Sequence, residues 1–117
     1  MRDHTKLRAF ELADQLALAV YETTREFPKD EQFSLTSQMR RAAVSCASNV
    51  VEGCARNSES DYLRFLDMAY GSVREIEYQA SLAYRLGYLS AGVHASLHDR
   101  CIETSKVLSG LIRSLRS

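Results

Sequence analysis

Residues 34–56 read SLTSQMRRAAVSCASNVVEGCAR, and no other part of the chain indicates its architecture as clearly. The apolar side chains recur at spacings of three and four, which is the period of one face of an α-helix. Ser34 stands where a helix prefers an N-cap residue. The pattern predicts a helix from about Ser34 to Arg56, with a core stripe of Leu35, Met39, Ala42, Ala43, Cys46, Val50 and Gly53.

The same period continues on both sides of this helix. A first helix is predicted from about Thr5 to Glu26, before the only proline, Pro28. Ser58 is expected to cap a third helix that ends at Gly87, and Ser90 to cap a fourth. The predicted core positions are Leu7, Phe10, Ala13, Leu16, Val20 and Phe27 in the first, Tyr62, Phe65, Leu66, Ala69, Val73, Ile76, Ala80 and Ala83 in the third, and Leu97, Cys101, Thr104, Leu108, Leu111 and Leu115 in the fourth.

These four segments predict a single all-α domain spanning residues 1–117. No segment alternates with the period of two that is typical of a strand. The connections are short, which makes consecutive helices antiparallel neighbours. We therefore expect an antiparallel up-down-up-down four-helix bundle.

A polar shoulder lies beside the core stripe of the second helix and contains Gln38, Arg41, Ser45, Asn49, Glu52 and Arg56. In an antiparallel hairpin, this shoulder faces the matching side of the third helix. We predict an inter-helix polar network there, made of the ion pairs Arg41–Glu75 and Glu52–Arg64 with Ser45 and Ser72 between them. Gly71 is expected to allow a close approach at the level of the two serines.

The opposite flank of the second helix carries a second apolar strip, formed by Val44, Ala47 and Val51. A helix that packs on a core with one face and exposes the other to solvent needs only one apolar strip. We interpret the strip as an oligomer interface that packs against tyrosines or other side chains of a neighbouring copy. Ordinary scattered surface apolar residues are the alternative interpretation.

Composition excludes several classes of protein. The apolar fraction is 45% and the charged fraction 26%, which is typical of a folded domain. No run of about 18 apolar residues and no apolar signal region occur, so we expect a cytoplasmic protein without membrane contact. The three cysteines are expected to be reduced core residues.

No motif predicts chemistry, a cofactor or a small-molecule substrate, so we expect no enzyme. There is no nucleophile elbow and no glycine-rich phosphate loop. His94, His98 and Cys101 recur on one helix face with spacings that suit zinc, but a fourth ligand is not evident. We interpret Cys101 as a core residue and the histidines as a solvated first turn. Tyr70, Tyr78, Tyr84 and Tyr88 are interpreted as core or interface anchors, with base stacking as the alternative.

The second and third helices carry a family resemblance. The residues concerned are Phe27-Pro28, Glu31, Leu35, Gln38-Met39-Arg40-Arg41-Ala42, Ser45, Ser48-Asn49, Glu52-Gly53, Arg56, Phe65-Leu66, Ala69, Gly71-Ser72 and Glu75. In these positions the chain resembles the four-helix-bundle proteins encoded by intervening sequences in bacterial 23S ribosomal RNA genes. The resemblance extends from about Leu7 to Leu115, and Phe10 stands where the family usually has tryptophan.

The resemblance implies a homo-oligomer, typically a pentamer, without an established enzymatic activity. It also implies kinship with the accessory protein of diversity-generating retroelements, which works with a reverse transcriptase and nucleic acid. The leading hypothesis is therefore an oligomeric binding or accessory module for structured RNA or DNA. A structural or protein-interaction scaffold that binds no nucleic acid is the alternative.

Basic residues that remain after internal pairing are the expected nucleic-acid contacts. Fifteen basic and fifteen acidic residues give a net charge of zero, so one copy offers few such contacts. Arg41 and Arg64 are assigned to carboxylates and are set aside. The remaining candidates are Arg40, Arg113, Arg116, Arg2, Lys6 and Arg8.

Overall fold

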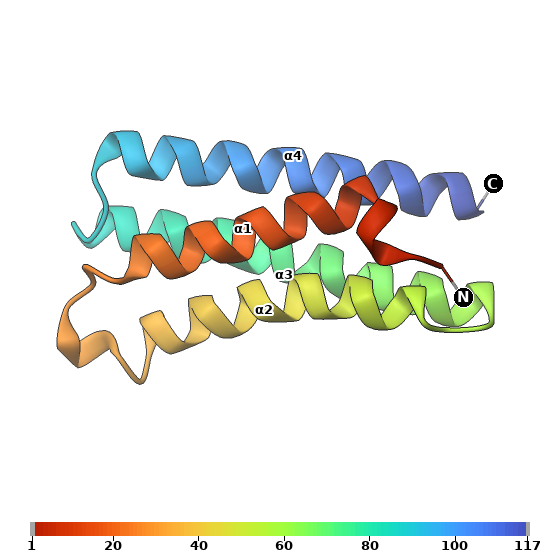
Figure 1. Cartoon of the computed structure of the whole chain (residues 1–117). Coiled ribbons are helices and arrows are strands. Elements are labelled where there is room, and N and C mark those ends of the chain that lie inside the picture. Colours follow the sequence, from red (N-terminus) through yellow and green to blue (C-terminus); the bar gives the residue numbers. More distant parts are fainter. Residues whose placement is uncertain (1, 117) are drawn as a thin grey trace.

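The computed structural model describes residues 2–116, and over this part of the chain all regular structure is helical (Figure 1). The four α-helices are α1 (Arg8–Thr24), α2 (Leu35–Cys54), α3 (Glu59–Arg85) and α4 (Ala91–Arg116). Short 3₁₀ turns, η1 (His4–Lys6) and η2 (Lys29–Glu31), precede α1 and α2. Consecutive helices run in opposite directions, so the predicted four-helix bundle is confirmed.

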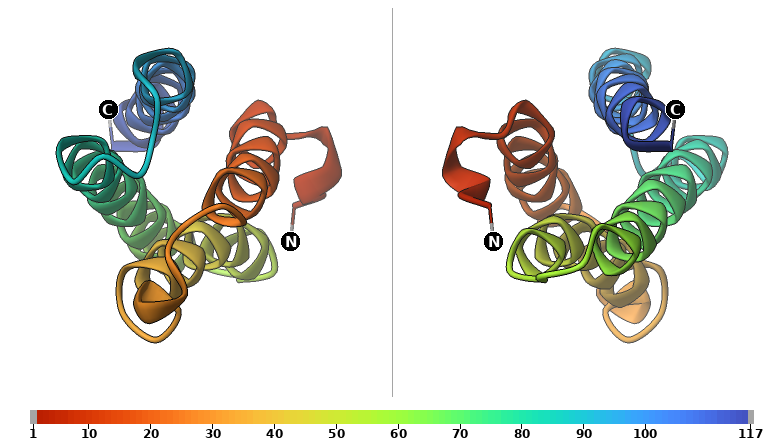
Figure 2. Two further views of the ribbon diagram at one scale, coloured as in Figure 1. Left: turned by 90° about the vertical axis from the view of Figure 1, so that its left-hand side faces the viewer. Right: turned by 90° about the vertical axis from the view of Figure 1, so that its right-hand side faces the viewer.

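Each helix packs against two neighbours, in the ring order α1, α2, α3, α4 and back to α1 (Figure 2). The contact between α2 and α3 is the most extensive of the four. The bundle measures 43 × 24 × 19 Å, so its long dimension follows the helix axes. None of the described helices has an apolar stretch long enough to cross a lipid bilayer.

The buried positions of α2 and α3 agree with the sequence prediction, whereas those near the end of α4 differ from it. Every predicted core position of these two central helices is buried. In α4, Ile112 is buried, while Leu111 and Leu115 are only partly buried. Alternating steps of four and three assume 3.5 residues per turn, whereas a straight helix has 3.6 and drifts by about 20° per heptad. Two heptads after Leu97, this drift brings Ile112 to the core.

The chain before α1 also differs from the prediction. Leu7 is extended, with φ −97° and ψ 124°, so the first helix begins at Arg8 and not at Thr5. The segment folds back onto the end of α2, where the Arg2 amide donates to the Cys54 carbonyl at 2.7 Å. The Arg2 guanidinium lies 3.9 Å from the centre of the Tyr62 ring. A backbone hydrogen bond and a cation–π contact therefore close this end of the bundle.

Three of the four predicted helix boundaries have the expected caps. Ser58 Oγ accepts from the Asp61 amide and Ser90 Oγ from the Val93 amide, each at 3.1 Å. Gly87 has φ 85°, the left-handed conformation that favours glycine at a helix C-terminus. Ser34 precedes α2 but does not cap it, because its hydroxyl donates to Glu31 instead.

Gly53, and not Gly71, permits the close approach of α2 and α3. A Cβ atom on Gly53 would lie 2.9 Å from Phe65 Cβ and 3.2 Å from Tyr62 Cδ1. Gly71 is exposed, and a Cβ atom there would meet nothing within 4 Å. The predicted role of Gly71 is therefore wrong, because this residue sits on the outer side of α3 and away from α2.

We expect Gly53→Ala to destabilise the protein by about 1–3 kcal/mol, since the added methyl group overpacks the contact with Phe65. Gly71→Ala is the matched control and should stabilise by about 0.5–1 kcal/mol through helix propensity alone. Urea denaturation followed by circular dichroism measures both changes. Equal effects of the two substitutions would contradict this account of the packing.

Candidate interaction surfaces

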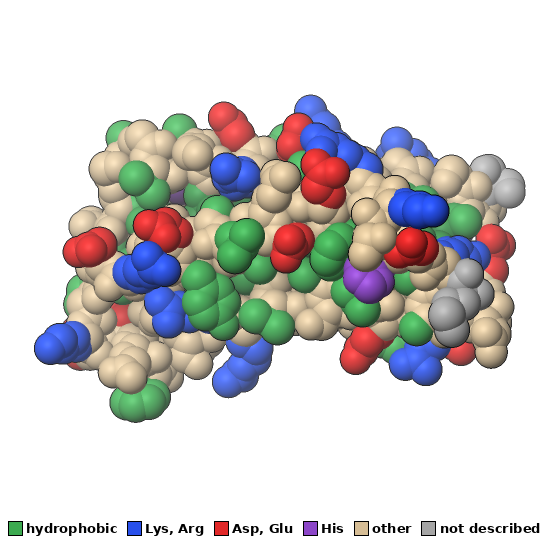
Figure 3. Space-filling model, in the orientation of Figure 1, with side chains coloured by type: hydrophobic (Ala, Val, Ile, Leu, Met, Phe, Trp, Pro, Cys, Tyr) green, Lys and Arg blue, Asp and Glu red, His purple; other side chains and the backbone are tan. Residues whose placement is uncertain are grey.

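Large apolar side chains are exposed on the outer side of α1 and α2. Leu18 and Tyr21 on α1 are 67% and 41% exposed, Phe33 before α2 is 90% exposed, and Val44 on α2 is 45% exposed. Figure 3 shows hydrophobic side chains gathered over these two helices. We call these four residues, together with the adjoining Ala47 and Val51, the α1–α2 surface.

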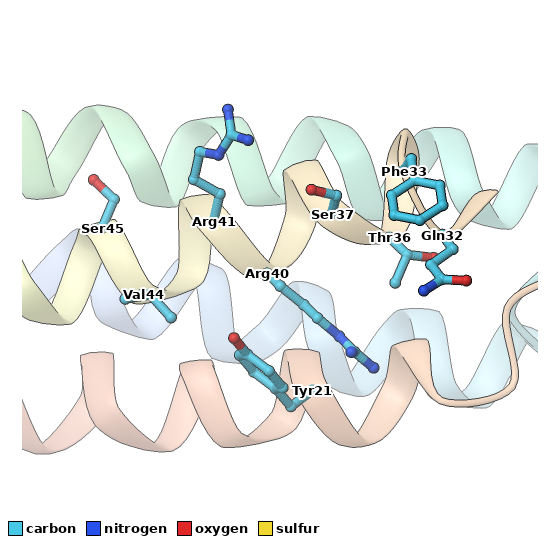
Figure 4. Close-up of a pocket in the computed structure, with 9 residues that line it drawn as sticks. All are labelled: Tyr21, Gln32, Phe33, Thr36, Ser37, Arg40, Arg41, Val44 and Ser45. Carbon is cyan, nitrogen blue, oxygen red and sulfur yellow. The ribbon is translucent and has the colours of Figure 1, made fainter.

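The α1–α2 surface contains a groove of about 650 Å³ (Figure 4). Tyr21 forms one wall from α1, while Phe33 and Val44 belong to the opposite side. Other residues that line the groove are Gln32, Thr36, Ser37, Arg40, Arg41 and Ser45. This arrangement can receive an apolar side chain from a partner beside the Arg40 guanidinium, whereas the Arg41 side chain points away from Tyr21 (Figure 4).

The predicted strip of Val44, Ala47 and Val51 accounts for only part of this surface. Val44 is exposed, but Ala47 and Val51 are half-buried. Leu18, Tyr21 and Phe33 contribute exposed apolar area that the sequence analysis missed. The available signal was the spacing of Leu18 and Tyr21, which lie one turn apart and outside the core stripe of the first helix.

Hydrogen bonds to Glu31 hold the segment that presents Phe33. The Glu31 carboxylate accepts from Ser34 Oγ at 2.6 Å and from the Tyr88 hydroxyl at 2.7 Å. These bonds lower the pKa of Glu31 from its ordinary value of 4.5, and the bond to Glu31 raises the pKa of Tyr88 from 10.0. The stabilisation from Glu31 is therefore present at neutral pH and is lost as the pH falls through the lowered pKa. The stabilisation from the Tyr88 hydroxyl is lost only as the pH rises through the raised pKa of Tyr88.

We expect Tyr88→Phe to lower the melting temperature at pH 7, and the difference from the unmodified protein to be smaller at an acidic pH below the lowered pKa of Glu31, where this carboxylate is protonated. Tyr78→Phe is the control, because the Tyr78 hydroxyl makes no hydrogen bond with the residues that the structure describes. Thermal denaturation at the two pH values measures the effect. A difference that is the same at both values would argue against the Glu31 bond.

Hydroxyl and amide groups join α2 to α3 where the polar network was predicted. Ser72 Oγ lies 3.1 Å from Ser45 Oγ, and Asn49 Nδ2 donates to Ser45 Oγ at 3.0 Å. Farther along α3, Gln79 Nε2 donates to Glu75 at 3.2 Å. The serines therefore meet between the two helices, as expected.

Neither predicted ion pair is formed within residues 2–116. Arg41 and Glu75 do line one small groove between α2 and α3, but they do not approach within 4.0 Å. Arg64 turns towards its own helix, where it lies 3.9 Å from Asp61 and 4.6 Å from the centre of the Phe65 ring, so Glu52 is not its partner. Exposed ion pairs contribute under about 1 kcal/mol, so such local contacts compete successfully with pairing across the hairpin.

Three of the predicted nucleic-acid contacts already interact with other side chains of the same chain. Arg8 pairs with Glu11 at 2.6 Å and lies 3.8 Å from Glu103. Arg116 pairs with Asp67 at 2.5 Å, which joins α4 to α3. Arg2 lies over a tyrosine ring, as described above.

The other three predicted contacts, Arg40, Arg113 and Lys6, differ in how far their side chains are buried and hydrogen-bonded. Arg40 is half-buried, because its Nε donates to Thr24 Oγ1 at 2.8 Å and its guanidinium lies 4.8 Å from the centre of the Tyr21 ring. Arg113 donates to Ser109 Oγ at 3.0 Å and makes no ion pair with a residue of the range 2–116. Lys6 is exposed and, among residues 2–116, makes no ion pair. Arg41, which had been set aside as paired, is likewise exposed without an ion pair in this range.

The cysteines are buried, which limits their chemistry. Burial raises the pKa of Cys46 and of Cys101 to about 12, and it also raises the pKa of Cys54. A thiol that stays protonated is a poor nucleophile and a poor metal ligand. His94 stacks on Tyr84, and no group of three or more His, Cys, Asp or Glu side chains within residues 2–116 is arranged to hold a metal ion.

Comparisons with known proteins agree with this fold. The sequence model of a family described as 23S rRNA-intervening sequence protein matches residues 5–110. A crystal structure from Bacteroides thetaiotaomicron, described as a protein with unknown function from the S23 ribosomal protein family, is similar with a TM-score of 0.82. The similarity covers 90% of this chain and 95% of that chain at 21% identity, and it supports the fold alone. Among curated protein sequences, none is significantly similar.

Proposed function

The chain belongs to the family of 23S rRNA-intervening sequence proteins, and from this premise we propose that it is a self-associating helical module that binds structured RNA or DNA and catalyses no reaction. In this proposal, copies of the chain join through the α1–α2 surface. Basic side chains that the bundle leaves unpaired then recur in every copy and contact phosphates. The exposure of Leu18, Tyr21, Phe33 and Val44 on one side of the bundle is the observation that carries the proposal.

Self-association accounts for an apolar surface of this kind. Single exposed apolar residues are ordinary, but a contiguous group around a groove is typical of an interface. Phe33 is 90% exposed although hydrogen bonds order the segment that carries it, so a partner would find this ring already in place. A closed ring uses heterologous contacts, so this surface meets a different surface of the next copy. A pentamer, the assembly that the family resemblance implies, is such a ring.

Assembly would also increase the number of cations that one particle presents to a nucleic acid. Each chain has a net charge of zero, so its cations are balanced by carboxylates of the same copy. Within residues 2–116, Lys6, Arg41 and Arg113 are among the cations that make no ion pair. Non-specific affinity for nucleic acid grows with the number of phosphates neutralised. A ring presents every cation several times, and this multivalency raises the affinity without a new contact. A scaffold that binds no nucleic acid is the second candidate, and the neutral net charge favours it.

We expect the unmodified protein to sediment as an oligomer at tens of micromolar, and Leu18→Glu combined with Val44→Glu to sediment as a monomer. Carboxylates placed in an apolar interface lose their hydration without gaining a partner. Val93→Glu is the matched control, because Val93 is 43% exposed and lies on α4. Circular dichroism checks that every variant remains folded. A monomeric unmodified protein, or an oligomer that persists in the Leu18/Val44 variant, would refute this interface.

We expect labelled structured RNA to bind the oligomer at about 50 mM salt, and to bind more weakly at about 200 mM because counterions compete for the phosphates. The Leu18/Val44 variant should bind at least tenfold more weakly, since it has lost multivalency. Fluorescence anisotropy measures both effects. An oligomer that binds no RNA or DNA even at the lower salt concentration would replace this proposal with the scaffold.

A further inference from the structure

A second groove lies between α3 and α4. This pair of helices is on the other side of the bundle from α1 and α2 (Figure 2). It consists of two hollows of about 390 and 360 Å³. Arg74 lines the first hollow and Tyr70 the second, and Arg74 Nη1 lies 3.4 Å from the Tyr70 hydroxyl, so the two adjoin. We call this the α3–α4 groove. Its other lining residues are Glu77, Tyr78, Ser81, His94, His98, Ser105, Lys106, Ser109 and Arg113.

Aromatic rings are accessible along this groove. Tyr78 is 61% exposed and lines the first hollow. His94 lines the same hollow, and its ring stacks on that of Tyr84, just outside the groove, at 4.6 Å with an angle of 8° between their planes. Tyr70 lies 14 residues before Tyr84 on the same helix, which corresponds to about 21 Å at 1.5 Å per residue. The groove thus combines separate aromatic surfaces over a length that suits a few nucleotides.

The groove is positively charged although the whole chain is neutral. Arg74, Lys106 and Arg113 line it, and among residues 2–116 Glu77 is the one acidic residue that does so. Glu77 lies 3.2 Å from Arg74 Nε and 3.9 Å from His98 Nδ1, so its charge is already opposed within the groove. Lys106 and Arg113 make no ion pair with the residues that the structure describes. Serine hydroxyls beside them add hydrogen-bonding groups that suit phosphate oxygens.

We infer that the α3–α4 groove binds a short single strand of nucleic acid, an inference that rests on the proposed function and specifies its surface and its ligand. Bases stack on Tyr78 and on the Tyr84–His94 pair, while phosphates lie near Lys106 and Arg113. A duplex keeps its bases stacked inside, whereas a loop or a single strand offers them to aromatic side chains. Exposed rings in the first hollow and the cations Lys106 and Arg113 in the second match a single strand better than a uniformly acidic peptide.

The test measures anisotropy of a labelled single-stranded RNA of about 12 nucleotides and of the same sequence as a duplex, each with the assembled protein. The variants are Tyr78→Ala, Tyr78→Phe and Lys106→Gln, with Lys29→Gln as the control for lost charge outside the groove. Tyr78→Ala should weaken single-strand binding about tenfold, and Tyr78→Phe should restore it, because the ring and not the hydroxyl stacks. Lys106→Gln should reduce the slope of log Kd against log salt by about 0.7, and Lys29→Gln should not change it.

Three outcomes would overturn the inference and leave the proposed function intact. The first is unchanged single-strand binding by Tyr78→Ala while structured RNA still binds. The second is tighter binding of the duplex than of the single strand, or displacement of the RNA by polyglutamate at an equal concentration of charges. The third is dissociation of the oligomer by Tyr78→Ala in sedimentation, which would make the groove part of the contact between copies. Loss of all nucleic-acid binding by the unmodified protein would instead reject the proposed function.

Discussion

Gly53 on α2 lies so close to Phe65 on α3 that an alanine at this position would place two Cβ atoms 2.9 Å apart. Small residues are also buried farther along both helices, including Ala42 and Cys46 on α2 and Ala69 on α3. Because α2 and α3 approach so closely, they form a central hairpin against which α1 and α4 pack. The α1–α2 surface and the α3–α4 groove are consequences of this arrangement, since each lies along the outside of one helix pair.

The two surfaces differ in chemistry because the bundle distributes its charges unevenly. Arg8 and Arg116 are neutralised by carboxylates at inter-helix contacts, and Arg40 is anchored to α1. The cations that remain include Lys106 and Arg113 beside the tyrosines of α3. A chain with zero net charge thus keeps a local positive groove on one side and exposed apolar side chains on the other. The first composition suits an anionic polymer, and the second suits another copy of the chain.

Hydrogen bonds and ring contacts also anchor the connecting segments at both ends of the bundle. Glu31 joins the segment before α2 to Tyr88 beyond the end of α3, so two chain reversals at one end of the bundle are tied together. At the other end, Arg2 bonds to the last turn of α2 and covers Tyr62. Phe33 is therefore exposed on an anchored segment, which lowers the entropy cost of burying it against a partner.

Local pattern in the sequence was sufficient for the helices, their order, the cores of α2 and α3, and the caps at Ser58, Gly87 and Ser90. These features depend on periodicity and on residue chemistry within a few positions, which one chain displays directly. Tertiary structure alone decided that Gly53 and not Gly71 lies in the contact, that Ile112 replaces Leu111 in the core, and that Arg41 does not pair with Glu75. Each depends on how far one helix is rotated and displaced against the next. In α4, a drift of about 20° per heptad over two heptads buries Ile112 and leaves Leu111 half-buried. Ion pairs depend in addition on which of several nearby partners a long side chain reaches, a choice worth under about 1 kcal/mol at an exposed site.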